Sequence, residues 1–244
     1  MGERWDREKI GIMGGTGGMG AWFAAFFRKR GHEVVTAGRR EGPSPRELAG
    51  LCRVVVVAVP IPATVEVIRA VGPHLPPDSL LMDLTSLKVE AMAAMMETAP
   101  GEVVGLHPLF GPRVTSLRGE NVVLCPGRGE EGRGWITRVL KEAGARVVVA
   151  DAGRHDEIMA VVQGLNHLDN LVFGLAVAAG GLSREELAAF STPAFRARMD
   201  LVDRVSANPP LYRALVGENP HVGPHARRFL DLFREQMEAL TKKG

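Results

Sequence analysis

A glycine-rich segment near the start of the chain, Lys9–Gly20, constrains the fold more than any other feature. Its sequence, KIGIMGGTGGMG, begins with a short apolar run, and a helical pattern follows at 21–30. Gly15, Gly17 and Gly20 have the spacing G-x-G-x-x-G. In a strand–turn–helix unit the first of these glycines allows the tight turn, the second lets the backbone approach a pyrophosphate, and the third lets the helix pack on the strand. The segment therefore predicts a dinucleotide site, although a glycine-rich turn without a ligand has the same pattern.

Strand and helix patterns alternate through the first half of the chain. The run RVVVVAV at 53–59 is apolar throughout, which is typical of a strand buried on both faces of a parallel sheet. Further strands are expected at 10–13, 33–37, 80–84, 103–106, 122–124 and 146–150, with helices near 21–30, 63–71, 89–98 and 135–143. This alternation predicts a Rossmann-like, doubly wound α/β domain.

After Asp151 the strand-like runs stop and helical patterns replace them. Helices are expected at about 155–179, 184–190, 194–206, 211–216 and 225–240. We therefore predict a dinucleotide-binding domain at 1–152 and an all-helical domain at 153–244 for substrate binding and dimerisation. A small helical domain with one long helix cannot easily bury all its apolar faces alone, so we expect a homodimer paired through it.

Composition excludes some classes of protein. Hydrophobic residues make up 45% of the 244 residues and charged residues 24%, as in a soluble globular protein, and the net charge of +2 gives no reason to expect a nucleic-acid partner. No apolar run has transmembrane length, and the first nine residues lack the apolar segment of a signal peptide. Cys52 and Cys125 form no CxxC motif, so a reduced, cytoplasmic protein is expected.

The residues after the second expected strand bear on the choice of dinucleotide. NAD sites usually carry an acid there, but this chain reads Thr36-Ala37-Gly38-Arg39-Arg40 with no acid before Glu41. An arginine pair suits a 2′-phosphate, so NADP is favoured over NAD, unless the pair is only a solvated loop. The cofactor-binding residues expected are Gly15, Thr16, Gly17, Gly18, Met19, Gly20, Arg39, Arg40, Val59 and Pro60.

Two polar segments follow expected strands at the carboxyl edge of the sheet, where ligands bind in open α/β folds. The first, DLTSLK at 83–88, places a hydroxyl and an ammonium there, although Thr85 or Ser86 could equally be a helix N-cap. The second, GLHPLFGP at 105–112, places His107 at a strand end, where a neutral imidazole could accept a proton. A structural role for His107 is the alternative.

A third polar group lies on the long expected helix. Gln163, Asn166, His167 and Asn170 are spaced by three and four residues, which puts them on one face. That face lines a ligand cleft, with Gln163 among the substrate-binding residues, or it contacts a partner, or it is simply solvated. His221 and His225 are four residues apart, but a third ligand with clear spacing is lacking, so no metal site is expected.

Together these segments resemble the prephenate dehydrogenase family of tyrosine biosynthesis. The resemblance covers nearly the whole chain and rests on the glycine loop, DLTSLK, GLHPLFGP, QGLNH and DRVSANPPLY. It implies NAD(P)-dependent oxidative decarboxylation of prephenate to 4-hydroxyphenylpyruvate, or the arogenate-using variant. It also implies a dinucleotide domain paired with a helical dimerisation domain.

The resemblance gives roles to individual residues. His107 is similar to the catalytic histidine that hydrogen-bonds the ring hydroxyl, and Ser86 to the serine that orients it. His167 resembles a substrate-contacting histidine, and Arg204 the arginine that binds the ring carboxylate. The spacing from Arg204 to Asn208 is one residue shorter than the family pattern. Arg196, Arg198 or Arg213 is therefore an alternative carboxylate ligand.

Two other functions remain open from the sequence. One is an F420-dependent NADP reductase, whose glycine loop also reads GGTG, but this leaves His107, His167 and Arg204 without roles. The other is a non-catalytic NADP-sensing protein, because a fold does not fix a function.

Overall fold

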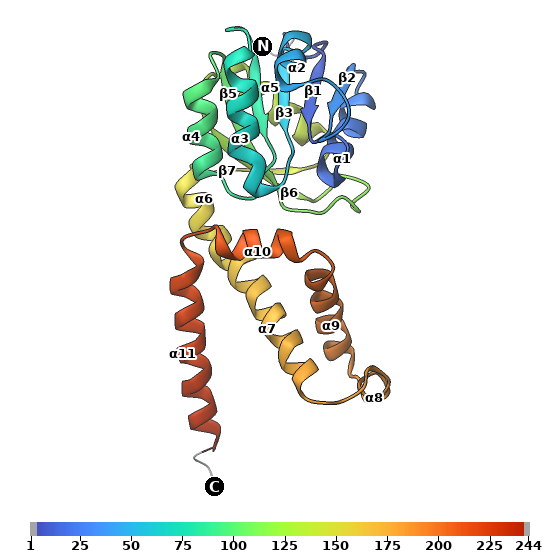
Figure 1. Cartoon of the computed structure of the whole chain (residues 1–244), viewed down its shortest axis with the longest axis vertical. Helices are drawn as coiled ribbons and strands as arrows, with labels where there is room; N and C mark the ends of the chain where they lie inside the picture. Colours follow the sequence, from blue (N-terminus) through green and yellow to red (C-terminus); the bar gives the residue numbers. More distant parts are fainter. Residues whose placement is uncertain (1–3, 242–244) are drawn as a thin grey trace. The chain divides into compact units, whose positions relative to one another are not determined.

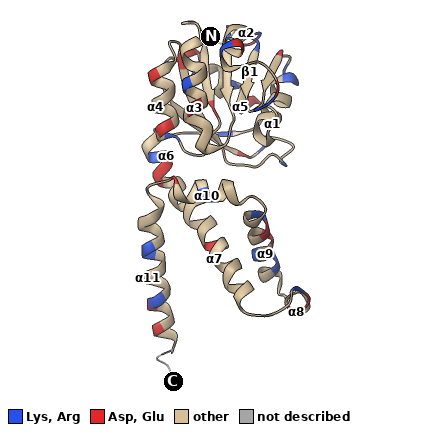
Figure 2. Ribbon diagram, viewed as in Figure 1, with Lys and Arg blue, Asp and Glu red and all other residues tan. Residues whose placement is uncertain are grey.

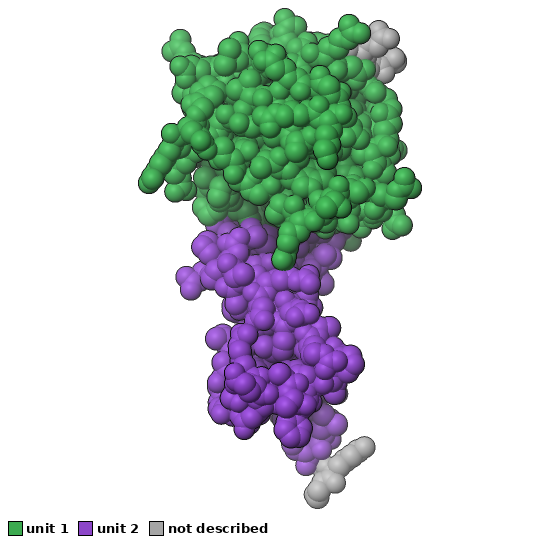
Figure 3. Space-filling view, turned by 90° about the vertical axis from the view of Figure 1, so that its right-hand side faces the viewer, with its two compact units in different colours: residues 1–155 green, residues 156–244 purple. Residues whose placement is uncertain are grey.

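The computed structural model describes residues 4–241. The first three and last three residues, at which the two predicted domains begin and end, lie outside this range. The chain divides into two compact units, Met1–His155 (unit 1) and Asp156–Gly244 (unit 2), which are coloured separately in Figure 3. Unit 1 has a mostly parallel, Rossmann-like sheet and unit 2 is helical, so the predicted fold class is confirmed.

Unit 1 is built on a seven-stranded sheet with the order β2-β1-β3-β4-β5-β6-β7 (Figure 1). Its strands are β1(Ile10–Met13), β2(Val34–Ala37), β3(Val54–Val57), β4(Leu80–Asp83), β5(Glu102–Pro108), β6(Asn121–Pro126) and β7(Arg146–Val149). The first five are parallel, but β6 runs antiparallel to β5, with His107 opposite Val123. No helix lies between β5 and β6, and without a crossover helix the chain turns back on itself.

Helices cover both faces of this sheet. They are α1(Gly18–Arg28), α2(Pro45–Leu51), α3(Ile61–Val71), the short 3₁₀ helix η1(Gly72–His74), α4(Val89–Thr98) and α5(Glu131–Glu142). One apolar core includes Phe27 of α1 stacked on Trp135 of α5, with ring centroids 6.1 Å apart. The other core lies under α2, α3 and α4. Valines 54–57 of β3 are all buried, because the two cores lie on opposite faces of this central strand.

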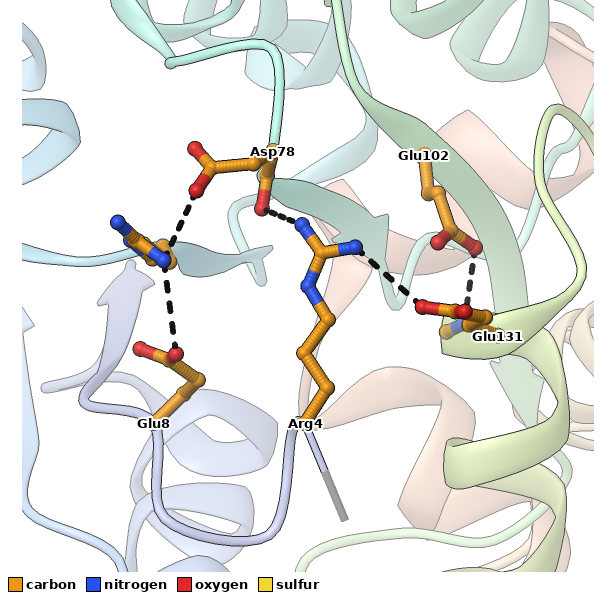
Figure 4. A network of polar contacts seen from close by, with 7 residues as sticks. Arg4, Glu8, Asp78, Glu102 and Glu131 are labelled. Carbon is orange, nitrogen blue, oxygen red and sulfur yellow. Dashed lines mark hydrogen bonds and ion pairs between the residues drawn. The ribbon is translucent and has the colours of Figure 1, made fainter. Parts of the chain in front are cut away.

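A polar network joins the segments that precede the parallel strands (Figure 4). Arg4 donates to the carbonyl of Asp78 at 2.8 Å and pairs with Glu131 at 3.3 Å. Arg53 pairs with the Asp78 carboxylate at 2.8 Å and with Glu8 at 4.0 Å. Glu8, Arg53 and Asp78 stand just before β1, β3 and β4, so the network marks the amino edge of the sheet. Exposed pairs of this kind contribute about 0–1 kcal/mol each, and their role here is structural.

Unit 2 consists of helices. They are the end of α6(Ala152–Met159), a π-helical turn η2(Ala160–Leu165), α7(Asn166–Ala179), α8(Arg184–Ala189), α9(Pro193–Ser206), α10(Pro209–Gly217) and α11(Val222–Thr241). Two glycines permit close approach between these helices. A Cβ on Gly164 would lie 2.2 Å from Val222 of α11, and one on Gly174 would lie 2.5 Å from Val202 of α9.

Charged residues of both signs are interspersed along α9 and α11, while α7 carries few charges (Figure 2). Within residues 4–241, no helix is both long and apolar enough to cross a membrane. The same range contains no cluster of histidine, cysteine and carboxylate side chains that could hold a metal ion. Cys52 and Cys125 are both buried and form no disulfide with each other.

Candidate active site

The predicted site residues of unit 1 gather at the carboxyl edge of the sheet, opposite the polar network of Figure 4. The glycine loop follows β1, Arg39 and Arg40 follow β2, Ser86 follows β4, and His107 is the second-last residue of β5. These strands are parallel and lie in the order β2-β1-β3-β4-β5, so the groups are spread along one edge in that order. A ligand on this edge would meet the arginines at one end and the histidine at the other.

The glycine loop is built as a tight turn into α1. The positive φ of this turn falls on Gly14, at 82°, one residue before the predicted turn glycine Gly15. Gly15 is needed for another reason, because its Cβ would lie 2.6 Å from the side chain of Thr36 on β2. Gly20 allows close packing, since its Cβ would lie 2.1 Å from the Gly14 carbonyl oxygen.

The amino end of α1 has the features of an anion site. Gly17 is the N-cap and supplies no side-chain hydrogen bond, and the first turn contains no acidic residue. Thr16, Gly17 and Gly18 are exposed, and the Gly17 N–H donates to the Gly14 carbonyl at 3.0 Å within the turn. The helix dipole adds positive potential at this end, and a phosphate would satisfy the terminal N–H groups. The residues present therefore fit a dinucleotide pyrophosphate.

The end of β2 lies beside this loop. Arg39 and Arg40 are exposed, and a Cβ on Gly38 would lie 2.6 Å from the Thr16 hydroxyl oxygen. The loop is fixed by a hydrogen bond from Gly38 N to Glu41 O at 2.8 Å. After β3, Val59 is half-buried, and the exposed Pro60 is the N-cap of α3.

The DLTSLK segment contains a buried ion pair. Asp83 ends β4, and its carboxylate accepts hydrogen bonds from the Lys88 ammonium and, at 2.9 Å, from the Thr85 amide. Lys88 also donates to the Leu106 carbonyl of β5 at 2.7 Å. Burial raises the pKa of the Asp83 carboxyl, while the charge of Lys88 opposes this. The predicted ammonium is thus held inside the protein, and only Ser86 is partly exposed among the hydroxyls.

Neither Thr85 nor Ser86 is the N-cap of the following helix. Lys88 occupies that position and makes no side-chain capping bond. The capping interpretation of this segment is therefore wrong, because the segment 84–87 first crosses the end of the sheet and α4 begins only at Val89.

His107 is buried, with 2% of its surface exposed, and it contacts a second buried histidine. Its Nδ1 lies 2.8 Å from Nε2 of His155, which is in the first turn of α6. The pKa of His107 is well below its ordinary value of 6.5, chiefly because of burial, and the nearby His155 and Lys88 lower it further. His107 is consequently neutral at pH 7 and can accept a proton.

The loop after His107 packs on the helix that follows the glycine loop. The indole N–H of Trp22 in α1 donates to the Val114 carbonyl at 2.6 Å. The Phe110 ring meets the Trp22 ring edge-on, with centroids 5.2 Å apart. A Cβ on Gly18 would lie 3.1 Å from Pro112. The GLHPLFGP segment therefore packs directly against the glycine loop and α1.

In unit 2 the four polar residues predicted to share one helix face lie in different environments. Gln163 lies in the π-helical turn and is half-buried, whereas Asn170 is buried and donates to the Asn166 carbonyl at 2.7 Å. The wider turn of a π-helix shifts Gln163 around the axis relative to α7. His167 packs edge-on against Tyr212 of α10, with ring centroids 4.6 Å apart, and burial lowers its pKa.

The four candidate arginines differ in their contacts. Arg198 pairs with Asp169 of α7 and lies over the Phe173 ring, 4.7 Å from its centroid. Arg196 donates to the Ser191 carbonyl at 2.7 Å. Arg204 and Arg213 are exposed and make no hydrogen bond or ion pair with any described residue. Arg204 and Arg213 therefore keep their guanidinium donors available for a ligand.

Two elements of this site were not predicted. The sequence predicts His155 only as the start of a long helix, because its contact with His107 spans 48 residues of sequence. Gly14 lies outside the G-x-G-x-x-G spacing, although it was visible as a further glycine directly after the first strand.

Comparisons with known proteins agree with this architecture. Residues 25–149 match the family model of the prephenate dehydrogenase nucleotide-binding domain, and residues 151–243 match that of the prephenate dehydrogenase dimerization domain. A probable arogenate/prephenate dehydrogenase of Methanocaldococcus jannaschii is 32% identical over 96% of this chain and 57% of its own length. The T-protein of Enterobacter agglomerans is 34% identical over 96% of this chain and 62% of its own length.

Among solved structures, a prephenate dehydrogenase from A. aeolicus, in complex with hydroxyphenyl propionate and NAD+, has a similar fold. The TM-score is 0.74 at 19% identity, covering 98% of this chain and 91% of that one. The chain spans little more than half the length of the two curated relatives. Both family models together cover most of its residues, and the chain belongs to the prephenate dehydrogenase family.

Proposed function

We propose that the chain catalyses the NADP-preferring oxidative decarboxylation of prephenate to 4-hydroxyphenylpyruvate. In this proposal residues 1–152 bind the dinucleotide, and residues 153–244 bind substrate and form a dimer. The observation that carries the proposal is His107, a buried neutral base at the carboxyl edge of the sheet. It stands in a chain of the prephenate dehydrogenase family.

A pyridine dinucleotide would be held by the glycine loop, Gly15–Gly20, with Val59 and Pro60 at the end of β3. When bound, it supplies the acceptor for the hydride of the substrate. NADP is preferred in this proposal because Arg39 and Arg40 are exposed beside Thr16 and Gly38, without an acid before Glu41. Guanidinium groups pair with a 2′-phosphate, and an acid would instead accept from a ribose hydroxyl.

His107 would take the proton of the substrate's ring hydroxyl. Its Nδ1 faces His155, so Nε2 is the atom assigned to accept this proton. Burial supports the role, because a neutral imidazole remains the dominant form well below pH 6.5. Ser86, which follows the neighbouring strand β4, would orient the hydroxyl. As the hydroxyl carbon becomes oxidised, the ring carboxylate leaves as carbon dioxide and its bonding electrons complete the aromatic ring.

Prephenate carries two carboxylates, so its site requires fixed cations. Arg204 is assigned to the ring carboxylate, since its exposed guanidinium makes no hydrogen bond or ion pair with the described residues, and Arg213 is the alternative. His167 and Gln163 are assigned to substrate binding. Both side chains are half-buried on η2 and α7, which supports this, because each keeps some surface that a ligand can contact.

The dimer is proposed to form through unit 2. An apolar groove of 530 Å³ lies between α7 and α11 and is lined by side chains such as Leu168, Val172, Leu230 and Phe233. Leu230 and Phe233 are 47% and 58% exposed in the single chain. Contiguous apolar surface of this kind marks a protein interface. The protein is proposed to act in the cytoplasm.

The test is an assay with prephenate and arogenate, each with NADP and NAD. Turnover of prephenate with NADP at the highest kcat/KM is the expected result. A higher kcat/KM with arogenate would replace the substrate and keep the chemistry. Tight NADP binding without turnover of either substrate would overturn the proposal in favour of a cofactor-sensing protein.

A further inference from the structure

Two buried histidines of unit 1 face each other across one hydrogen bond. Nδ1 of His107 lies 2.8 Å from Nε2 of His155, with the ring planes at 65°. His155 is 1% exposed. Its place is fixed by the first turn of α6, where its amide donates to the Asp151 carbonyl at 2.9 Å. This contact joins the candidate base to an element remote in sequence.

A hydrogen bond between two imidazole nitrogens needs one proton and one lone pair. If the shared proton is on Nδ1 of His107, the Nε2 of His107 has a lone pair and can act as a base. If the proton is instead on Nε2 of His155, neutral His107 carries its own proton on Nε2 and cannot accept another there. The two arrangements have the same heavy-atom geometry, but only the first leaves Nε2 of His107 able to accept a proton.

The surroundings of His107 favour its neutral form. The Lys88 ammonium and the Asp83 carboxylate lie near the two rings and form their own ion pair at the end of β4. Burial lowers the pKa of His107 well below its ordinary value, and the nearby His155 and Lys88 lower it further. His107 at rest therefore carries one ring proton, on either Nδ1 or Nε2.

We propose that His155 is a positioning residue that fixes the tautomer of His107 by accepting the proton of its Nδ1. This inference rests on the proposed function, in which Nε2 of His107 takes the hydroxyl proton of the substrate. After that transfer His107 carries protons on both nitrogens, and its Nδ1–H still donates to His155. The substrate oxygen has lost one proton and the pair has gained one, and neither histidine is oxidised or reduced.

The kinetic test compares His155→Leu with His155→Gln. The leucine removes the acceptor, whereas Oε1 of the glutamine can reach the position of Nε2 and accept the same hydrogen bond. We expect kcat to fall roughly a hundredfold in His155→Leu, below the loss of about ten-thousandfold known for a carboxylate that fixes a catalytic histidine. His155→Gln should recover kcat to within about tenfold of the parent, because it restores the hydrogen bond. KM values should stay close to the parent's.

A matched control is His74→Leu, which removes an exposed histidine of unit 1 and should leave kcat unchanged. Equal kcat losses in His155→Leu and His155→Gln would overturn the inference, because a glutamine able to accept the bond would then give no rescue. Melting temperature and NADP binding show whether each variant is folded.

The second readout is the ¹⁵N NMR spectrum of the ligand-free parent protein, with the His107 signals assigned by their absence in His107→Asn. We expect a protonated Nδ1 and an unprotonated Nε2. A proton on Nε2 of His107 would overturn the inference even if prephenate is turned over. Conversely, the spectrum tests the tautomer even if the chain turns over no substrate. Failure of the proposed function is therefore distinguishable from failure of this inference. It also remains decisive if His155→Leu does not fold.

Discussion

Lys88 and Asp83, five residues apart, form an ion pair in which neither side chain has exposed surface. The pair joins the end of β4 to the start of α4, and the Leu106 carbonyl of β5 accepts a further hydrogen bond from Lys88. The pair therefore fixes the chain on either side of Ser86. His107 lies in β5, the strand next to β4.

Breaking this pair should destabilise the protein strongly. Lys88→Met leaves the Asp83 carboxylate buried without its cation, which costs about 3–5 kcal/mol of unfolding free energy. The double variant Asp83→Leu/Lys88→Met should be much closer to the parent, because it removes both charges. Urea denaturation of the parent, both single variants and the double variant measures the coupling. If the loss of unfolding free energy in the double variant equals the sum of the two single losses, the two groups act independently.

Arg39 and Arg40 should control the preference for NADP. Replacing both by alanine should raise the KM for NADP roughly tenfold to a hundredfold and change that for NAD little, since only NADP carries the 2′-phosphate. Arg46→Ala, which removes an exposed arginine of α2 in the same unit, is the control. Equal effects on the two cofactors would remove the 2′-phosphate assignment.

His107→Asn should lose turnover but not binding. Asparagine keeps a polar side chain and cannot accept the proton, so kcat should fall roughly a hundredfold to ten-thousandfold with little change in KM. In the parent, the lowered pKa of His107 in the free protein places the acidic limb of the kcat/KM profile below pH 6.5, with a plateau above it. A variant that retained this limb would move the role of base to another group, and His167 is the next candidate.

The same pKa predicts a pH dependence of stability. The unfolded chain binds a proton at His107 near pH 6.5, while the folded chain binds it only at lower pH. The unfolded state therefore holds more protons as the pH falls below 6.5, and stability decreases there. His107→Asn removes this contribution, so the fall in unfolding free energy between pH 6.5 and 5 should be smaller in the variant. A fall as steep as in the parent would assign it to other groups.

Arg204 should be sensitive to replacement by lysine, because a point charge does not reproduce bidentate geometry. Arg204→Lys should raise the KM for prephenate by about tenfold or more. Arg196→Lys is the control, since the Arg196 guanidinium already donates a hydrogen bond to the Ser191 carbonyl. If Arg213→Lys shows the effect and Arg204→Lys does not, the carboxylate ligand is Arg213.

Phe233→Asp should weaken the proposed dimer. It places a charge in the apolar groove between α7 and α11, and burying an unpaired charge is strongly unfavourable. Gln236→Asp adds the same charge at an exposed polar position of the same helix and should leave the dimer intact. Light scattering after size exclusion, at micromolar concentration, distinguishes the mass of a dimer from that of a monomer. A dimer of equal strength in both variants would place the interface elsewhere.

Local patterns predicted much of the fold. The valines of β3 and the strand-end position of His107 were visible because burial on both sheet faces leaves a continuous apolar run. The helix α2 was missed, although Ser44 and Glu47 have the spacing of the capping box that they form. The direction of β6 was also missed, because only the absence of a crossover helix before it determines that direction.

The rest could not be predicted for physical reasons. Five of the seven residues Gly14–Gly20 are glycine, so no local signal distinguishes the one with positive φ. The π-helical turn η2 has the same apolar pattern as an α-helix, and the close approach of Val222 to Gly164 within it is a tertiary contact. The contact between His107 and His155 depends on tertiary structure alone, since neither residue's neighbours encode it.

The hydrogen bond from Trp22 to Val114 has a consequence for how this protein responds to substitution. One indole ring sets the spacing between the helix that would carry the phosphates and the loop that leaves the base. Because the hydrogen bond and the ring contact both depend on this one indole, replacing Trp22 would release both segments from each other at once.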